Sequence, residues 1–246
     1  MSDPFFRPAT AGASAGTSFD AGLRAHMQRV FNYMGGGLAL TGAVAYLIAN
    51  TSLANLFFAI GADGQVHSTI LGMIGMLAPL AFVLYMQFRI RRMSLAALQI
   101  VFWSYCGLMG ISIALICLAY SGSDVARAFF VTAADFAAIS LYGYTTKRDL
   151  TGMGAFVMMG LLGLIIASVV NLFLHSSGLQ WAMSIAGVGI FTGLTAYQVQ
   201  AIKQSYDQSY GSDANSKMAV SGALSLYMSF INLFLSILRL MGNSRS

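Results

Sequence analysis

The chain has 246 residues, of which 57% are hydrophobic and only 9% are charged. Soluble domains carry about 25% charged residues, so the composition excludes an ordinary soluble protein and predicts a multi-pass membrane protein. The net charge of +5 does not indicate nucleic-acid binding, because membrane proteins collect Lys and Arg in their cytoplasmic loops.

The chain starts with a polar segment, MSDPFFRPATAGASAGTSFD, rich in small residues. It lacks the basic start and apolar core of a cleaved signal peptide. We therefore expect residues 1–20 to form a disordered cytoplasmic tail and residues 21–246 to form a single membrane domain.

Seven windows of about 20 mostly apolar residues follow, each long enough for a helix that crosses a bilayer. These windows are Val30–Ala49, Thr69–Phe88, Leu95–Tyr120, Val125–Thr145, Met153–Leu174, Leu179–Ile202 and Met218–Met241. Because the connections are short, we expect an all-α integral membrane protein in which seven transmembrane helices form one bundle in the lipid bilayer.

The distribution of Lys and Arg predicts the orientation of these spans. With the amino terminus inside, ten of the thirteen basic residues lie on the inner side: Arg7, Arg24, Arg29, Arg89, Arg91, Arg92, Lys147, Arg148, Lys203 and Lys217. Only Arg127, Arg239 and Arg245 lie outside. This positive-inside bias predicts a cytoplasmic amino terminus and, after an odd number of spans, a carboxyl terminus outside.

One acidic residue lies deep in a span. Asp135, in FFVTAADFAAISLYGYTTKRD, is about 15 Å from either end of its window, near the bilayer midplane. A charged Asp at that depth costs on the order of 3 kcal/mol. Two interpretations stay open: a proton or cation site, or a neutral structural acid bonded to a neighbouring helix.

The last span carries a polar face. Ser225, Ser229, Asn232 and Ser236 follow at three- and four-residue spacing. Such a face is expected to contact other helices, which predicts that the last helix lies in the middle of the bundle. In the preceding span, Gln198 and Gln200 approach the cytoplasmic interface.

The motifs of several enzyme classes are absent from the sequence. It has no H-E-x-x-H, no P-loop and no G-x-S-x-G, and its three histidines, His26, His67 and His175, fall at loops or span edges. An intramembrane aspartyl protease needs two carboxylates in one site, whereas only Asp135 is deep. We therefore expect no enzymatic activity, no cofactor and no resident metal, and the sequence does not indicate an oligomeric state.

Four segments match a known family. SLYGYTTKRDLTGMGAF (140–156), GLTAYQVQAIK (193–203), GALSLYMSFINLFLSILRLMG (222–242) and GLRAHMQRVFNYMGGGLALTG (22–42) resemble the bacterial branch of the Bax inhibitor-1/YccA family. The resemblance covers residues 20–242. It implies a bacterial inner-membrane protein in which six helices surround the last one.

The resemblance also implies a role. Family members are linked to calcium leak, to suppression of cell death and, in bacteria, to modulation of a membrane-bound AAA protease. In calcium-leak members two aspartates form a pH-sensing pair, but the matching positions here are Gln198 in TAYQVQ and Ser229 in LYMSFINLF. Gln and Ser do not titrate, and calcium sites normally include carboxylates, so this pH sensor is expected to be lost.

Two functions are therefore weighed. The first is an ion leak, with calcium as the candidate ion, along Gln198, Ser229 and Asn232, with Asp135 as a further candidate. Its cytoplasmic mouth would carry a basic cluster consisting of Arg89, Arg91 and Arg92. The second is a non-conducting interaction protein that binds a membrane-bound protease or another membrane partner.

Overall fold

The computed structural model describes residues 10–60, 66–89 and 93–242. In this part of the chain the elements are α1 (Thr10–Asn50), α2 (Ala54–Phe57), β1 (Phe58–Ile60), β2 (Val66–Ser68), α3 (Ile70–Arg89), α4 (Leu95–Ala119), α5 (Gly122–Thr145), α6 (Thr151–Leu174), α7 (Ser177–Ser205) and α8 (Ser212–Met241). The predicted helical class is confirmed. The exception is a small antiparallel hairpin, in which Phe58 of β1 lies opposite Ser68 of β2.

The first helix is longer than the predicted span. It begins at Thr10, so residues 10–20 of the predicted tail continue α1, whereas residues 1–9 lie outside the described residues. No proline interrupts the chain between Thr10 and Asn50, and proline is the residue that most strongly ends a helix.

Six helices in the described ranges are long and apolar enough to cross a membrane: α1 from Asp20 onward, α4, α5, α6, α7 and α8. The remaining predicted span coincides with α3, whose described apolar stretch, Ile70–Val83, is shorter. Six helices therefore support the membrane assignment, and the count of seven stays a prediction.

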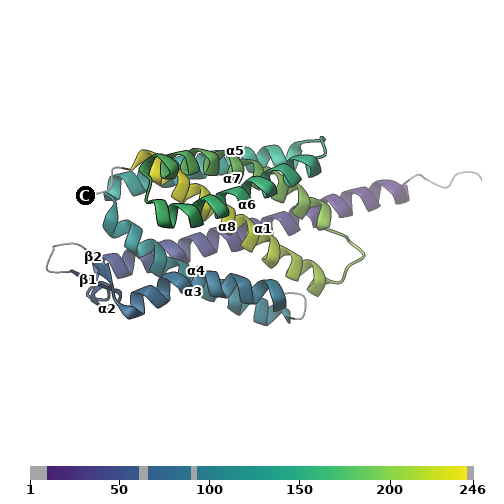
Figure 1. Ribbon diagram of the computed structural model, residues 1–246. Helices are drawn as coiled ribbons and strands as arrows, with labels where there is room; N and C mark the ends of the chain where they lie inside the picture. The colour runs from purple at the N-terminus through teal and green to yellow at the C-terminus, as the bar shows by residue number, and fades with distance from the viewer. Residues whose placement is uncertain (1–9, 61–65, 90–92, 243–246) are drawn as a thin grey trace, which may run out of the picture.

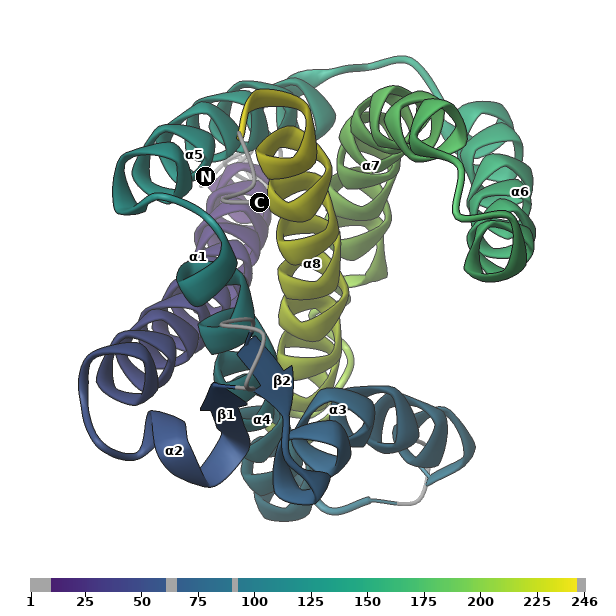
Figure 2. The same ribbon diagram turned by 60° about the vertical axis from the view of Figure 1, so that its left-hand side comes forward.

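The last helix is the most buried one. In its most apolar stretch 61% of the residues are buried, against 6% for α6. Its main neighbours are α1, α4, α5 and α7, while α6 packs mainly on α7 and α3 mainly on α4 (Figure 2). The burial agrees with an inner position for α8, but encirclement by all six other helices stays a prediction.

The first and last helices run in the same direction. Arg29, midway along α1, donates a hydrogen bond to Ser216 near the start of α8, 2.7 Å away, and Thr41, further along α1, meets Tyr227, further along α8. At the other end, Gly242 after α8 lies against Tyr120, which ends α4. The amino-terminal end of α1 and the carboxyl-terminal end of α8 therefore lie at opposite ends of the bundle (Figure 1).

A buried tyrosine joins three helices at the centre. Tyr227 of α8 is fully buried, and its hydroxyl lies 2.6 Å from the Thr41 hydroxyl of α1. Thr41 also faces the carbonyl oxygens of Gly37 and Cys106, at 2.9 and 2.8 Å. The threonine has a single hydrogen for these neighbouring oxygens, and either hydroxyl can be the donor in the bond between Thr41 and Tyr227. This network ties α1, α4 and α8 together.

Close backbone contact brings α5 against α7. A Cβ atom on Gly143 of α5 would lie 2.5 Å from the carbonyl oxygen of Ala196 on α7. Only glycine permits this approach, as is common between helices in lipid. Asp135 precedes Gly143 by about two turns of α5, so this contact helps to set which residues of α5 and α7 face each other near Asp135.

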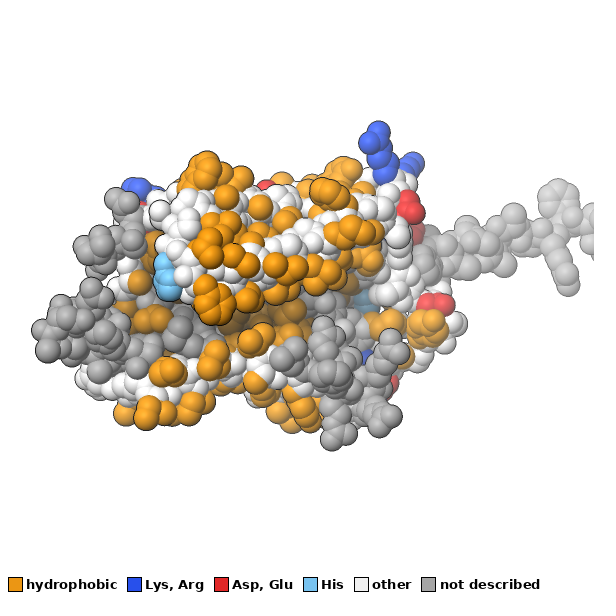
Figure 3. Space-filling model, in the orientation of Figure 1, with side chains coloured by type: hydrophobic (Ala, Val, Ile, Leu, Met, Phe, Trp, Pro, Cys, Tyr) orange, Lys and Arg blue, Asp and Glu red, His pale blue; other side chains and the backbone are white. Residues whose placement is uncertain are grey.

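The outer surface is that of a membrane protein. Apolar side chains cover the middle of the face in Figure 3, and the charged side chains visible there lie mainly toward the ends of the bundle. Many large apolar side chains of α6 are strongly exposed, among them Phe156, Leu172 and Phe173. A surface of this kind is stable only against lipid or another apolar partner.

Candidate functional site

Gln198 and Ser229 face each other across the interface between α7 and α8. The Ser229 hydroxyl donates a hydrogen bond to Gln198 Oε1, 2.9 Å away. Ser229 is only 2% exposed and Gln198 is half-buried. The structure thus brings together the two positions predicted to match the aspartate pair, and joins them through side chains that carry no titrating proton. We call this pair, with its immediate surroundings, the α7–α8 seam.

Asn232 lies outside this contact. Its side chain is exposed, and its Nδ2 donates to the carbonyl oxygen of Met228 on its own helix, 2.8 Å away. The prediction that the whole polar face of the last helix packs against other helices is therefore wrong at this residue. Between Ser229 and Asn232 the helix turns by about 300°, so the Asn232 side chain does not point toward Gln198.

A pocket of about 360 Å³ adjoins the seam between α6, α7 and α8. Asn232, Ser236 and Arg239 of α8 line it together with Ser168 of α6, and its other walls are apolar. Ser236 is buried against Gly187 of α7, where a Cβ would lie 2.6 Å from its hydroxyl oxygen. The polar groups of α8 thus continue from the seam toward the end of the helix.

Asp135 forms a separate polar contact. Thr192 of α7 donates a hydrogen bond from its hydroxyl to Asp135 Oδ2, 2.8 Å away, and both side chains are half-buried. Thr192 precedes Gln198 by six residues, about 9 Å along the helix. The acid is therefore bonded to a neighbouring helix, as the structural interpretation requires, and is not a member of the seam.

The predicted cytoplasmic mouth lies largely outside the described residues. Arg89 ends α3, and its side chain is not described. Arg91 and Arg92 fall in the segment 90–92. The assignment of these three cations to a mouth stays a prediction.

A loop fastens α7 beside the seam. Gln200 is buried, its Nε2 donates to the carbonyl oxygen of Arg148 at 2.7 Å, and its Oε1 accepts from the backbone N–H of Leu150 at 2.8 Å. In the same loop, hydrogen bonds from the hydroxyl and the N–H of Thr151 lower the pKa of Asp149 below its ordinary value. Asp149 therefore stays ionised at neutral pH, and Gln200 serves as an anchor for α7.

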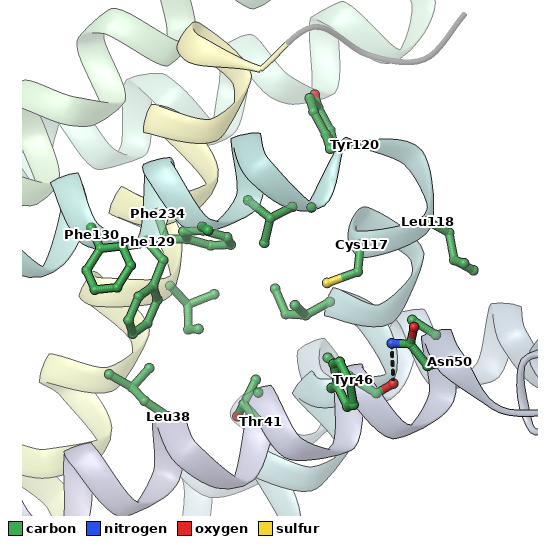
Figure 4. Close-up of a pocket in the computed structure, with 18 of the residues that line it drawn as sticks. Leu38, Thr41, Tyr46, Asn50, Cys117, Leu118, Tyr120, Phe129, Phe130 and Phe234 are labelled. Carbon is green, nitrogen blue, oxygen red and sulfur yellow. Dashed lines mark hydrogen bonds between the residues drawn. The ribbon is translucent and has the colours of Figure 1, made fainter.

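Another pocket, of about 650 Å³, lies between α1, α4, α5 and α8. In Figure 4, Leu38, Thr41 and Tyr46 of α1 lie across it from Phe129 and Phe130 of α5. Its walls are mainly apolar, and none of the residues that line it is charged. This pocket is therefore not a continuation of the α7–α8 seam.

Comparison with known proteins decides the family. The model of a family described as "Inhibitor of apoptosis-promoting Bax1" matches residues 23–246, nearly the whole chain. The chain belongs to this Bax inhibitor-1 family.

Its bacterial relatives cover the same length. This Bax inhibitor-1 family member is 45% identical over 233 residues to the uncharacterized protein RP147 of Rickettsia prowazekii, covering 94% of this chain and 95% of the relative. It is 42% identical to an uncharacterized protein of Caulobacter vibrioides over 233 residues, 94% and 93% of the two chains. It is 40% identical to the inner membrane protein YbhL of Escherichia coli strain K12 over 228 residues, 92% and 94%. The family and the inner-membrane relative support the membrane assignment made from the helices.

The structure of this Bax inhibitor-1 family member adds residues that sequence reasoning missed. Thr192 received no role, because a lone Thr in an apolar span is ordinary; only its placement opposite Asp135 distinguishes it. Thr41 and Tyr227 were likewise not connected, being 186 residues apart. In the described part of the chain, no three His, Cys, Asp or Glu side chains come together in a way that could hold a metal ion.

Proposed function

We propose that this protein is an ion-leak or ion-homeostasis protein, with calcium as the candidate ion, whose pathway follows the α7–α8 seam without a pH switch. The observation that carries the proposal is the direct bond between Ser229 and Gln198, 2.9 Å long. It occupies the position where the family resemblance implies a pair of aspartates. A hydroxyl and an amide keep the same charge at every physiological pH, so they hold α7 against α8 independently of pH.

The pocket next to the seam supports weak ion selectivity. Calcium sites normally use several carboxylate oxygens, whereas the polar groups here are the amide of Asn232 and the hydroxyls of Ser168 and Ser236. Arg239 adds a positive charge that disfavours a divalent cation. The arrangement therefore favours a slow leak over a selective, tight site for calcium.

A flux measurement tests this proposal. The purified protein is reconstituted into liposomes that contain a calcium-sensitive dye. The calcium leak is then compared at about pH 6 and about pH 8, the range in which an aspartate pair with a raised pKa would lose its shared proton. We expect flux above that of empty liposomes, changing by less than about twofold with pH, because the seam has no titrating group. Flux equal to that of empty liposomes would contradict the leak.

Replacing Asp135 in the same assay separates it from the seam. Asp135→Asn keeps an acceptor for Thr192, so the leak is expected to stay within about twofold of the wild-type rate at both pH values. A steep pH response of the wild type that disappears in this variant would identify Asp135 as a sensor. It would also overturn the proposal that this protein has lost pH control.

The proposal includes seven spans, with the amino terminus in the cytoplasm. Two observations support it: α1 and α8 run in the same direction, which requires an odd number of crossings, and α3 packs along α4. A reporter active only outside the cytoplasm is expected to be active after the carboxyl terminus and inactive in the 146–150 loop. The loop and the carboxyl terminus lie on opposite sides in any case, because α6, α7 and α8 cross between them. An active loop fusion beside an inactive carboxyl-terminal fusion would therefore contradict this topology, and with a cytoplasmic amino terminus it would indicate that α3 does not cross.

A second candidate function is a non-conducting interaction protein that modulates a membrane-bound protease. The exposed face of α6 favours it, since α6 packs mainly on α7 and leaves Met159, Leu162 and Ile166 exposed. A photo-cross-linker at Leu162 should then capture the protease in membranes, whereas one at Leu141 on α5 should not. Equal capture at both positions, or at neither, would count against this function.

A further inference from the structure

A groove separates α1 from α5 in the half of the bundle where α1 begins. Both helices pack on α8, yet they make few direct contacts with each other. The groove between them has a volume of about 620 Å³, and Phe230 of α8 forms part of its floor. On the α5 side Ala133 and Ala137 provide no large side chain, which leaves the groove open. It is separate from the α7–α8 seam, since no residue of α7 lines it.

The residues that line the groove become less polar from the end of the bundle inward. Arg24 of α1 and Tyr144 of α5 lie at its outer end, and Gln28 and Ser140 line it about one helical turn, or 6 Å, further in. Beyond them the lining consists of Phe31, Met34, Phe136 and Phe230. The order from the end of the bundle inward is thus a cation, then two hydrogen-bonding side chains, then an apolar channel.

Ser140 has a hydroxyl without a partner. The residue is only 6% exposed, and in the described structure its Oγ forms no hydrogen bond. Other buried hydroxyls of the bundle bond to the carbonyl four residues earlier, as Thr132 does to Ala128 and Thr195 to Phe191. An unsatisfied hydroxyl in a membrane interior is costly. The Ser140 oxygen is itself enclosed, so the side chain would turn about its χ1 angle to reach an acceptor that an occupant of the groove supplies.

Arg24 lacks a partner as well. No ion pair or hydrogen bond of its side chain is formed with any residue in the described ranges, and the side chain is exposed. Asp20, one turn earlier on α1, does not line the groove. A long cationic side chain at the end of a span extends toward the lipid headgroups, where it attracts phosphate.

We propose that this groove binds one anionic glycerophospholipid from the leaflet at the amino-terminal end of α1. The phosphate contacts Arg24, an ester carbonyl accepts from the Ser140 hydroxyl with Gln28 beside it, and one acyl chain lies along the apolar channel against Phe230. The lipid fills the gap between two helices that barely touch. Phe230 follows Ser229 in α8, so the bound acyl chain contacts the helix that carries the α7–α8 seam. The lipid site itself does not depend on whether the protein conducts ions.

The test uses lipid binding to the full-length protein in detergent, measured by native mass spectrometry. The probes are dioleoyl phosphatidylglycerol and dioleoyl phosphatidylcholine, which share acyl chains and differ in headgroup charge. We expect one phosphatidylglycerol per chain, bound in preference to phosphatidylcholine. Arg24→Gln should reduce the preference about fivefold, the effect of one basic residue at a membrane surface. Arg148→Gln, in the loop at the same end but outside the groove, should leave it unchanged.

A second variant tests the channel. Ala137→Leu places a larger apolar side chain in the groove and should abolish tight binding of both lipids, while circular dichroism and gel filtration report that the variant is folded. Equal affinity of the wild type for both lipids would overturn the proposal. So would an equal loss in Arg24→Gln and Arg148→Gln, or a dimer that Ala137→Leu dissociates without a change in lipid binding.

Discussion

Replacing both Gln198 and Ser229 with Asp is expected to make the leak steeply dependent on pH. The two side chains already touch, so the carboxylates would share one proton at low pH and repel each other once both are ionised. Repulsion separates α7 from α8 and the added charge attracts a cation. The flux in dye-loaded liposomes should therefore rise by about tenfold between about pH 6 and about pH 8.

The single variants are the controls for this result. Gln198→Asp and Ser229→Asp each add one carboxylate beside a neutral partner, so neither creates a shared proton or a repelling pair. Their pH response should be much smaller than that of the double variant. If the double variant responds to pH no more than the wild type does, the seam does not lie on the ion pathway.

Tyr227→Ala is expected to be the most destabilising single substitution discussed for this protein. The tyrosine is fully buried, bonds Thr41, and packs edge-on against Tyr105 and Phe102 with ring centroids 5.7 and 6.3 Å away. In a membrane, moving the tyrosine ring out of the helix interface costs little by itself, because lipid is also apolar. The substitution still leaves a cavity and removes the packing contacts of the ring. We expect a loss of about 3 kcal/mol in the free energy of unfolding, measured by detergent-induced unfolding.

Two further variants separate packing from hydrogen bonding. Tyr227→Phe removes only the hydroxyl that bonds Thr41 and should cost about 0.6 kcal/mol, the average for hydrogen bonds between helices in a membrane. Tyr142→Ala, on the exposed face of α5, should change stability by less than about 0.5 kcal/mol. Equal stability of Tyr227→Ala and Tyr142→Ala would contradict the central position of Tyr227.

Much of the helical framework could be predicted because a bilayer restricts the choices. A spanning segment must satisfy its backbone internally and be about 20 residues long, so apolar windows become helices. The windows Leu95–Tyr120 and Met153–Leu174 match α4 and α6 to within two residues at each end. The start of α1 was missed, since residues 10–29 are not an apolar window and helix propensity alone does not reveal a helix that extends beyond the bilayer.

Which polar residues pair with each other could not be predicted from the pattern of residues along each helix. Helical periodicity tells which residues share a face, but the neighbour that meets each face depends on how the helices rotate and pack. Ser229 faces Gln198, as the family resemblance implies, whereas Asn232 turns outward and Asp135 bonds Thr192. Glycine contacts such as Gly143 against Ala196 decide these rotations, because they allow the backbones to meet in one relative position.

The sequence by itself determined that this is a membrane protein of the Bax inhibitor-1 family without carboxylates at Gln198 and Ser229, because composition and side-chain chemistry are local properties. Only the tertiary structure decided that those two residues touch, that Asp135 belongs to a different contact, and that Ser140 lines a groove with no partner for its hydroxyl. These facts concern distances between helices, which follow from packing and not from the order of residues along one helix.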